Sequence, residues 1–301
     1  MMPGISTIIA VASLAAPRWA APSAPPAWEV VAGTGGYMSA CALGDGFLCL
    51  TWGGAAIELV HPGEDASVIV STGMEAVERL SEPSPGEGLA GFVISDPSGD
   101  SVCIVDSSGA VVAGWSGGSA GRPGWTADGR VLFTLDGFLA EGGAATPVES
   151  GAFVVVPSPG GSMAAWAAGD SLVIAGIQNG SRASFGMPAP VIDAAWPDGS
   201  SLLVILIDGT VVRLSTGDGT ISRFASGDGL AWNARLGAGL VTSSRDDGHM
   251  LLGSDSYLVT RSGRMRKVAA PAGTAPLSPG PAPWGFTAVD GLTGAVMLLR
   301  L

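Results

Sequence analysis

The chain has 301 residues, of which 47 are glycine and 21 are proline. Outside residues 5–16, no stretch without glycine or proline exceeds nine residues, whereas an average globular helix has roughly 11–12. This pattern excludes helical bundles and alternating βα folds, because interior glycine and proline destabilise helices. Disorder is excluded as well, since 47% of the residues are hydrophobic and only 13% are charged. The composition therefore predicts one large all-β domain.

The acidic charge balance restricts the partners. Fourteen Lys and Arg residues stand against 26 Asp and Glu residues, so the formal net charge is −12. Nucleic-acid binding needs a basic groove that follows the phosphates. The sequence has one basic cluster, which is short and typical of a solvated hairpin edge: Arg261, Arg264, Arg266 and Lys267. We therefore predict no nucleic-acid partner, and anionic membrane surfaces should repel the protein.

The first 26 residues differ in composition from the rest of the chain. A membrane-spanning helix needs about 20 apolar residues, but the longest apolar run, Ile5 to Ala16, has twelve. We therefore expect no integral membrane segment, although the mean hydropathy is +0.42. The run is typical of a secretory signal peptide, and a floppy apolar leader is the alternative. We interpret residues 1–26 as an export signal followed by a Pro/Ala-rich linker, which predicts a periplasmic or secreted protein.

Three cysteines do not form a disulfide framework. Cys41 and Cys49 flank Gly44-Asp45-Gly46, and a three-residue hairpin loop there would place the two cysteines opposite each other. A cross-strand bridge is therefore one alternative. We interpret both residues instead as small buried hydrophobic side chains, and we expect Cys103 in the core.

Short apolar strands recur along the chain with a period of about 39 residues. The most regular copy has four strands joined by three tight turns, with strands over residues 191–196, 201–207, 210–215 and 221–225. Its second turn, Asp208-Gly209, has counterparts at Asp96, Asp136 and Asp290. Tryptophans also recur and are expected to fill space between packed sheets: Trp52, Trp115, Trp125, Trp166, Trp196, Trp232 and Trp284.

Four-stranded units of this length are typical of the blades of a β-propeller. The last copy supplies three strands, within 275–279, 284–289 and 295–301, and Trp28 to Gly33 can supply the fourth. Borrowing that strand closes the ring and removes an open sheet edge. We predict an all-β, seven-bladed β-propeller of four-stranded antiparallel blades over residues 27–301, closed by an N-terminal strand and acting as a monomer.

Two of the first turns carry a recognisable motif. The segments Trp196-Pro197-Asp198-Gly199 and Trp125-Thr126-Ala127-Asp128-Gly129 resemble the Trp-Ser-Pro-Asp-Gly repeats of TolB-like and WD40-like bacterial propellers. The resemblance covers residues 28–301 as architecture and implies a propeller fold. Because this fold hosts many functions, it implies no particular activity.

Residues suited to catalysis or metal binding are sparse. The two histidines, His61 and His249, lie apart in the sequence, and each is expected at a surface turn beside glycine. The four aspartates of the second turns, Asp96, Asp136, Asp208 and Asp290, are expected at similar heights and are typical of hairpin turns. Another acidic group surrounds a proline-rich turn: Glu78, Glu82 and Glu87. We assign no catalytic, cofactor-binding or metal-binding residue.

Two functional hypotheses remain. The first is a non-catalytic exported propeller that binds a protein or peptide over one rim, because ring closure gives a rigid platform for variable loops. The alternative is a hydrolase or lyase whose acids, Asp96, Asp136, Asp208 and Asp290, line the central channel, with or without a divalent cation.

Overall fold

The computed structural model describes residues 28–300, with gaps at 33–35, 72–79, 81–83, 85–87, 127, 142–143, 148–154, 159, 209, 226–238, 243–247, 253–255, 261–264, 269–277, 280–284 and 291. The described residues form 27 β-strands and one short 3-10 helix, η1 (Trp52–Gly54). The all-β prediction is therefore confirmed. The export leader and Glu78, Glu82 and Glu87 lie outside the described residues.

The described strands form seven antiparallel sheets, which we number in chain order. Sheet 1 contains β2 (Tyr37–Leu43), β3 (Gly46–Thr51), β4 (Ala56–Val60) and β5 (Ser67–Ser71). Sheet 2 contains β6 (Leu89–Asp96), β7 (Gly99–Asp106) and β8 (Val111–Gly117). Leu80 forms an isolated bridge with Phe92 on the side of β6 away from β7. Because Leu80 holds the place of a first strand, we count β6, β7 and β8 as the second, third and fourth strands of this sheet. Sheet 3 contains β9 (Gly124–Trp125), β10 (Val131–Leu135), β11 (Phe138–Glu141) and β12 (Ala144–Pro147).

The remaining sheets have four strands each. Sheet 4 contains β13 (Val155–Pro157), β14 (Met163–Ala168), β15 (Ser171–Gly176) and β16 (Arg182–Gly186). Sheet 5 contains β17 (Val191–Asp198), β18 (Ser201–Leu206), β19 (Val211–Ser215) and β20 (Ile221–Ala225). Sheet 6 contains β21 (Gly239–Thr242), β22 (Gly248–Leu252), β23 (Ser256–Thr260) and β24 (Met265–Val268). Sheet 7 contains β25 (Ser278–Pro279), β26 (Gly285–Val289), β27 (Val296–Arg300) and β1 (Trp28–Ala32).

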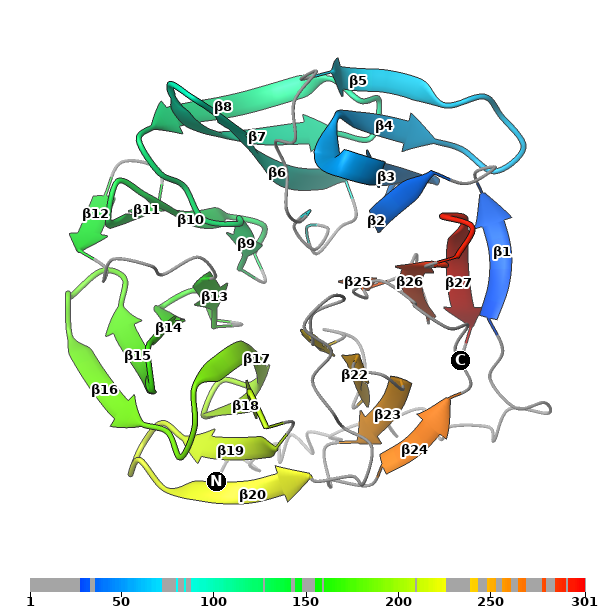
Figure 1. The fold of residues 1–301 in the computed structure, drawn as a ribbon. Coiled ribbons are helices and arrows are strands. Elements are labelled where there is room, and N and C mark those ends of the chain that lie inside the picture. The colour runs from blue at the N-terminus through cyan, green and yellow to red at the C-terminus, as the bar shows by residue number, and fades with distance from the viewer. Residues whose placement is uncertain are drawn as a thin grey trace, which may run out of the picture.

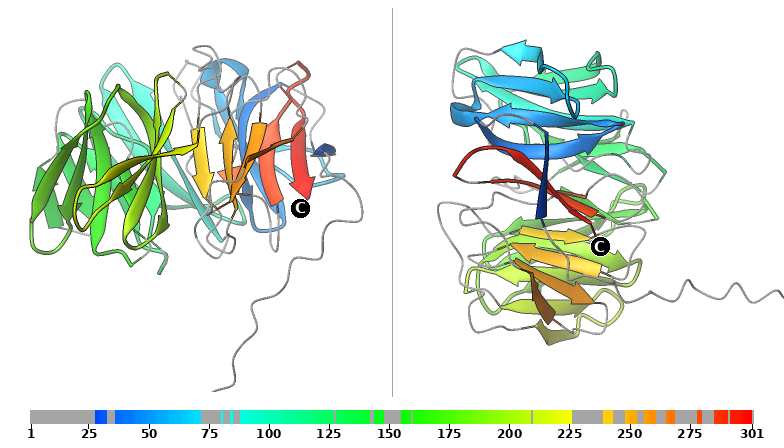
Figure 2. Two further views of the ribbon diagram at one scale, coloured as in Figure 1. Left: turned by 90° about the horizontal axis from the view of Figure 1, so that it is seen from below. Right: turned by 90° about the vertical axis from the view of Figure 1, so that its right-hand side faces the viewer.

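The sheets are arranged around a common centre, and the first strand of a sheet lies nearest that centre (Figure 1). Figure 2 shows the strands running between two broad faces. Because successive strands are antiparallel, their connections alternate between these faces. We call one the second-turn face; it carries the turn between the second and third strands of each sheet and the connections between sheets. The first-turn face carries the first and third turns.

The hydrophobic core lies between neighbouring sheets. Cys41 and Leu48 of sheet 1 pack with Phe92 of sheet 2. Similar clusters join sheet 3 to sheet 4, sheet 4 to sheet 5, and sheet 7 to sheet 1, while Trp115 of sheet 2 lies 4.8 Å from Phe133 of sheet 3 between ring centroids. Strand β21 of sheet 6 contacts β17 and β25 of its two neighbours. Each described sheet therefore packs against a sheet on both sides.

The two ends of the described chain meet in sheet 7. Strand β1 pairs with β27, with Trp28 opposite Leu299 and Val30 opposite Met297. The pairing that the sequence predicted between the N-terminal and C-terminal segments is present in the structure. It leaves β1, rather than β27, as the outer strand of the sheet.

A second backbone connection joins sheet 7 to sheet 1 on the second-turn face. Gly36 and Tyr37 donate their amide protons to the carbonyl oxygens of Thr293 and Gly294, each over 3.2 Å. Trp52 in turn donates its amide to Gly36 O over 2.8 Å. We call the described residues around these bonds, Gly36, Trp52–Gly54, Asp290 and 292–295, the seam. The second turns of sheets 1 and 7 are therefore joined there through the connection that leads into β2.

The register of the first hairpin decides the question of the cysteines. Its loop has two residues, Gly44 and Asp45, because Leu43 pairs with Gly46. The three-residue loop expected from the sequence is wrong, and a one-residue shift in register moves side chains to the opposite face. Cys41 therefore lies opposite Leu48, and Cys49 lies opposite Ala40. Both cysteines are buried and neither forms a disulfide, which confirms the interpretation as small hydrophobic side chains; Cys103 is partly buried.

We expect Gly294→Ala to destabilise the protein strongly, by about 2–5 kcal/mol. Gly294 has φ +71°, and a Cβ there would collide with the backbone nitrogens of Gly36 and Tyr37. Gly137→Ala is the matched control, because Gly137 has φ +78° with no atom within 4 Å of the added Cβ. Its loss should be about 1–2 kcal/mol, from backbone strain alone. Denaturant unfolding measures both variants, and equal losses would contradict close packing at the seam.

Candidate interaction surface

Three of the four second-turn aspartates cap their own hairpins, as is typical of turns. Asp96 Oδ1 accepts bonds from the Ser98 amide and hydroxyl, over 2.6 and 2.5 Å. These bonds, the hydroxyl first, lower the pKa of the Asp96 carboxyl. Asp208 Oδ1 accepts from the amide of Thr210 over 2.8 Å. Asp290 Oδ1 accepts from the amides of residues 292 and 293 over 2.7 and 3.1 Å.

Asp136 has a different role, because it links two sheets. It has φ +50°, a conformation unusual for a residue with a side chain. Its Oδ1 accepts bonds from the amides of Gly118 and Ser119, over 2.6 and 3.1 Å. These two residues belong to the connection between sheets 2 and 3, so the carboxylate fixes the path of the chain between them.

These aspartates do not gather around the common centre of the sheets. The second turns join the second and third strands of a sheet, whereas the first strands lie nearest the centre (Figure 1). Among the residues that the structure describes, no three His, Cys, Asp or Glu side chains form a group that could hold a metal ion. The carboxylates thus stand one strand away from the channel that the hydrolase hypothesis requires them to line.

The structure separates the two histidines and corrects one expectation. His61 follows β4 on the first-turn face, where its Nδ1 lies 3.3 Å from Asp45 Oδ1. Its ring covers Gly46, since a Cβ at that glycine would lie 2.9 Å from the ring. The expectation of a surface turn for His249 is wrong, because its backbone pairs with Thr242 and Val259 inside β22.

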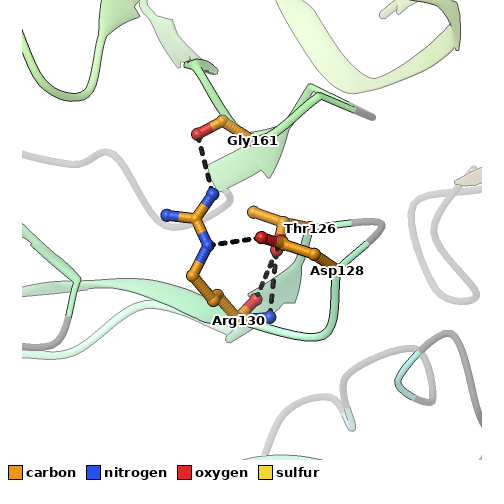
Figure 3. A network of polar contacts seen from close by, with 4 residues as sticks. All are labelled: Thr126, Asp128, Arg130 and Gly161. Carbon is orange, nitrogen blue, oxygen red and sulfur yellow. Dashed lines mark hydrogen bonds and ion pairs between the residues drawn. The ribbon is translucent and has the colours of Figure 1, made fainter.

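On the first-turn face, a network of polar contacts links two neighbouring turns, as Figure 3 shows. Thr126, a buried residue, accepts the Arg130 amide proton on its hydroxyl over 3.0 Å and also contacts Asp128. Arg130 donates from Nε to Asp128 over 2.9 Å and from Nη2 to Gly161 O over 3.3 Å. Gly161 lies in the first turn of sheet 4, so Arg130 connects the first turns of two sheets.

A buried hydroxyl at the first turn recurs in other sheets. Ser158 accepts the Met163 amide proton, and Ser84 accepts the Leu89 amide proton, each over 3.1 Å. In both cases the backbone amide of the serine donates to the carbonyl oxygen of the same partner residue. The serine or threonine of the repeated turn motif therefore closes the hairpin, which is a structural role rather than a chemical one.

Large apolar side chains are exposed on the second-turn face. Trp52, Phe138, Ile207 and Leu292 lie in or beside the second turns of sheets 1, 3, 5 and 7, with 55%, 45%, 45% and 79% of their surface exposed. The expectation that tryptophan fills space between sheets holds for the buried Trp166 and Trp196 but is wrong for Trp52. The other large apolar residues exposed in the described part of the chain lie on outer strands or their edges: Val30, Val68, Val111 and Val112.

Charge on the second-turn face is mostly negative. Its described second turns carry five carboxylates, on Asp96, Asp136, Asp170, Asp208 and Asp290. In the described connections between sheets on this face, the one cation is Arg122. Of the expected basic cluster, Arg266 and Lys267 are in β24, the outer strand of sheet 6, while Arg261 and Arg264 lie outside the described residues. The face therefore combines exposed apolar groups with acidic ones.

Comparison of structures identifies the architecture. A chain of the crystal structure of a mitotic checkpoint complex superposes with a TM-score of 0.69 and 12% sequence identity, covering 99% of each chain. This protein has a WD40-like β-propeller fold. In total 1210 chains of solved structures match the propeller, so the likeness carries no activity with it. No family model and no curated protein sequence matches the chain. In the described part of the propeller, no helix is long and apolar enough to cross a membrane.

Proposed function

We propose that the protein is a non-catalytic interaction module that binds a protein or peptide partner on its second-turn face. The observation that carries this proposal is the exposure of four large apolar side chains on that one face: Trp52, Phe138, Ile207 and Leu292. The turns of Trp52 and Leu292 are linked by backbone hydrogen bonds through Gly36, and exposed apolar groups on one continuous surface are typical of interaction sites. Aromatic side chains are also enriched where interfaces gain most of their binding energy.

The scaffold under this face is rigid, which favours recognition by its turns. We propose that the seven sheets are the blades of a ring that β1 closes. Two observations support closure: the pairing of β1 with β27 and the cluster of Tyr37, Val289 and Val296 between sheets 7 and 1. Turns held by such a frame lose little conformational entropy on binding, which favours affinity.

The positions of the carboxylates favour binding over the hydrolase alternative. Asp96, Asp208 and Asp290 use Oδ1 to hold their own turns, and Asp136 holds a connection between sheets. A general acid or base must instead reach a reacting group. We further propose that residues 1–26 direct export, with mature protein beginning between about Ala16 and Ala27 by the small-residue rule for cleavage. The apolar run at residues 5–16 supports this part of the proposal.

The proposed interaction face is tested by comparing substitutions of exposed apolar residues on the second-turn face with substitutions on the outer strands. Phe138→Ser combined with Ile207→Ser should weaken capture of the partner from native extract by at least about tenfold, since buried apolar anchors dominate interface energies. Val68→Ser combined with Val112→Ser is the matched control, because these two side chains are at least as exposed as Phe138 and Ile207 but lie on the outer strands of sheets 1 and 2. Quantitative mass spectrometry of the captured proteins measures the effect.

Both double variants should melt at the temperature of the unchanged protein, because all four side chains face solvent. Capture that falls only in the Val68 and Val112 variant would place the interface on the outer strands and contradict the proposal. Hydrolysis of a lactone, glycoside or phosphoester that disappears in Asp136→Asn or Asp208→Asn would also contradict it, in favour of an enzyme.

A further inference from the structure

The seam between sheets 7 and 1 forms a distinct part of the second-turn face. Trp52 and Leu292 are the most exposed apolar side chains on the second-turn face, and they belong to opposite ends of the described chain. Their turns are linked by two backbone hydrogen bonds through Gly36, one from Trp52 and one to Thr293. The two side chains therefore project from one connected piece of backbone.

The seam is open on its outer side and rigid beneath. A Cβ added at Gly36 or Gly53 would meet no atom within 4 Å, so nothing in the described structure covers these turns. Below them, buried Tyr37 donates its hydroxyl proton to Glu58 Oε2 over 2.8 Å. Burial, and then this bond, raise the pKa of Tyr37, so the hydroxyl keeps its proton and the contact persists at physiological pH.

The negative charge of the second-turn face indicates which kind of partner can bind at the seam. Asp290 begins the turn that carries Leu292, and the described second turns of the same face add four more carboxylates. A second copy of the chain would bring two acidic faces together in a protein of net charge −12, which like charges oppose. An anionic lipid surface is opposed for the same reason. A basic partner is attracted.

We propose that the seam binds a basic polypeptide segment of another protein that carries large apolar side chains. The inference rests on the proposed function and specifies one part of its surface and the ligand that binds this part. The apolar side chains pack against Trp52 and Leu292, while Lys or Arg residues beside them face the carboxylates of Asp290 and neighbouring turns. Because the segment contacts sheets 1 and 7 together, its binding also stabilises the junction between them.

Three short synthetic peptides test the chemistry with the full-length protein. The first places Arg and Lys around a Trp-Leu pair; the second replaces the basic residues with Glu; the third keeps them but replaces Trp and Leu with Ser. We expect the first to bind most tightly, by at least about tenfold, and to weaken as NaCl rises from about 50 to about 500 mM. Fluorescence anisotropy of labelled peptides measures the dissociation constants.

Two double variants locate the site. Trp52→Ala with Leu292→Ser should weaken binding of the first peptide by at least about tenfold. Val68→Ser with Val112→Ser should leave it unchanged, and melting temperatures show that both variants are folded. Unchanged binding in the seam variant, or equal binding of all three peptides, overturns the inference. The inference is also overturned if sedimentation shows that the unchanged protein is a dimer and the seam variant is a monomer, because a second copy of the chain would then occupy the seam.

Failure of this inference and failure of the proposed function give different results. If the peptides do not bind at the seam but the captured partner still depends on Phe138 and Ile207, the interaction module stands and the seam is not its site. If neither the peptides nor the captured partner depends on any side chain of the second-turn face, both proposals fall together.

Discussion

The pairing of β1 with β27 is the interaction on which the rest of the architecture depends. It places the first and last described strands of the chain in one sheet and brings Gly36 within hydrogen-bonding distance of the turn that ends at Gly294. Without it, β27 would present an open sheet edge and Leu292 would have no fixed relation to Trp52. A long-range contact of this kind costs chain entropy. Burial of the apolar cluster between sheets 7 and 1 must contribute enough stability to offset that cost.

Much of this fold could be predicted because its repeat depends on local chemistry. The strands of sheet 5 lie within two residues of the expected ranges, since apolar runs and Asp-Gly turns mark both ends of each strand. The third hairpin of that sheet shows why: Asp218 accepts the Thr220 amide proton over 3.0 Å, a bond made within the turn itself. The missing strand of sheet 7 was predictable for a related reason, because an incomplete unit and an unassigned apolar segment were left at the two ends.

The candidate surface could not be predicted in the same way, because exposure depends on tertiary position. Trp52 lies in the turn after β3 and is exposed, whereas Trp166 lies within β14 and is buried between sheets. Gly53 and Gly54, which follow Trp52, both adopt positive φ, a conformation of turns rather than of strands. The three-residue loop expected between Cys41 and Cys49 was wrong, because the hairpin has a two-residue loop. One residue of loop length determines which side chains face each other across a hairpin.

The proposed ring is tested most directly by amide hydrogen exchange in the full-length protein, followed by mass spectrometry. If β1 closes the ring, the amides of β1 that bond to β27 should exchange as slowly as those between β26 and β27, and both sets should open in the same cooperative unit. Protection of β26 and β27 with rapid, tail-like exchange throughout β1 would contradict closure, and with it the seam.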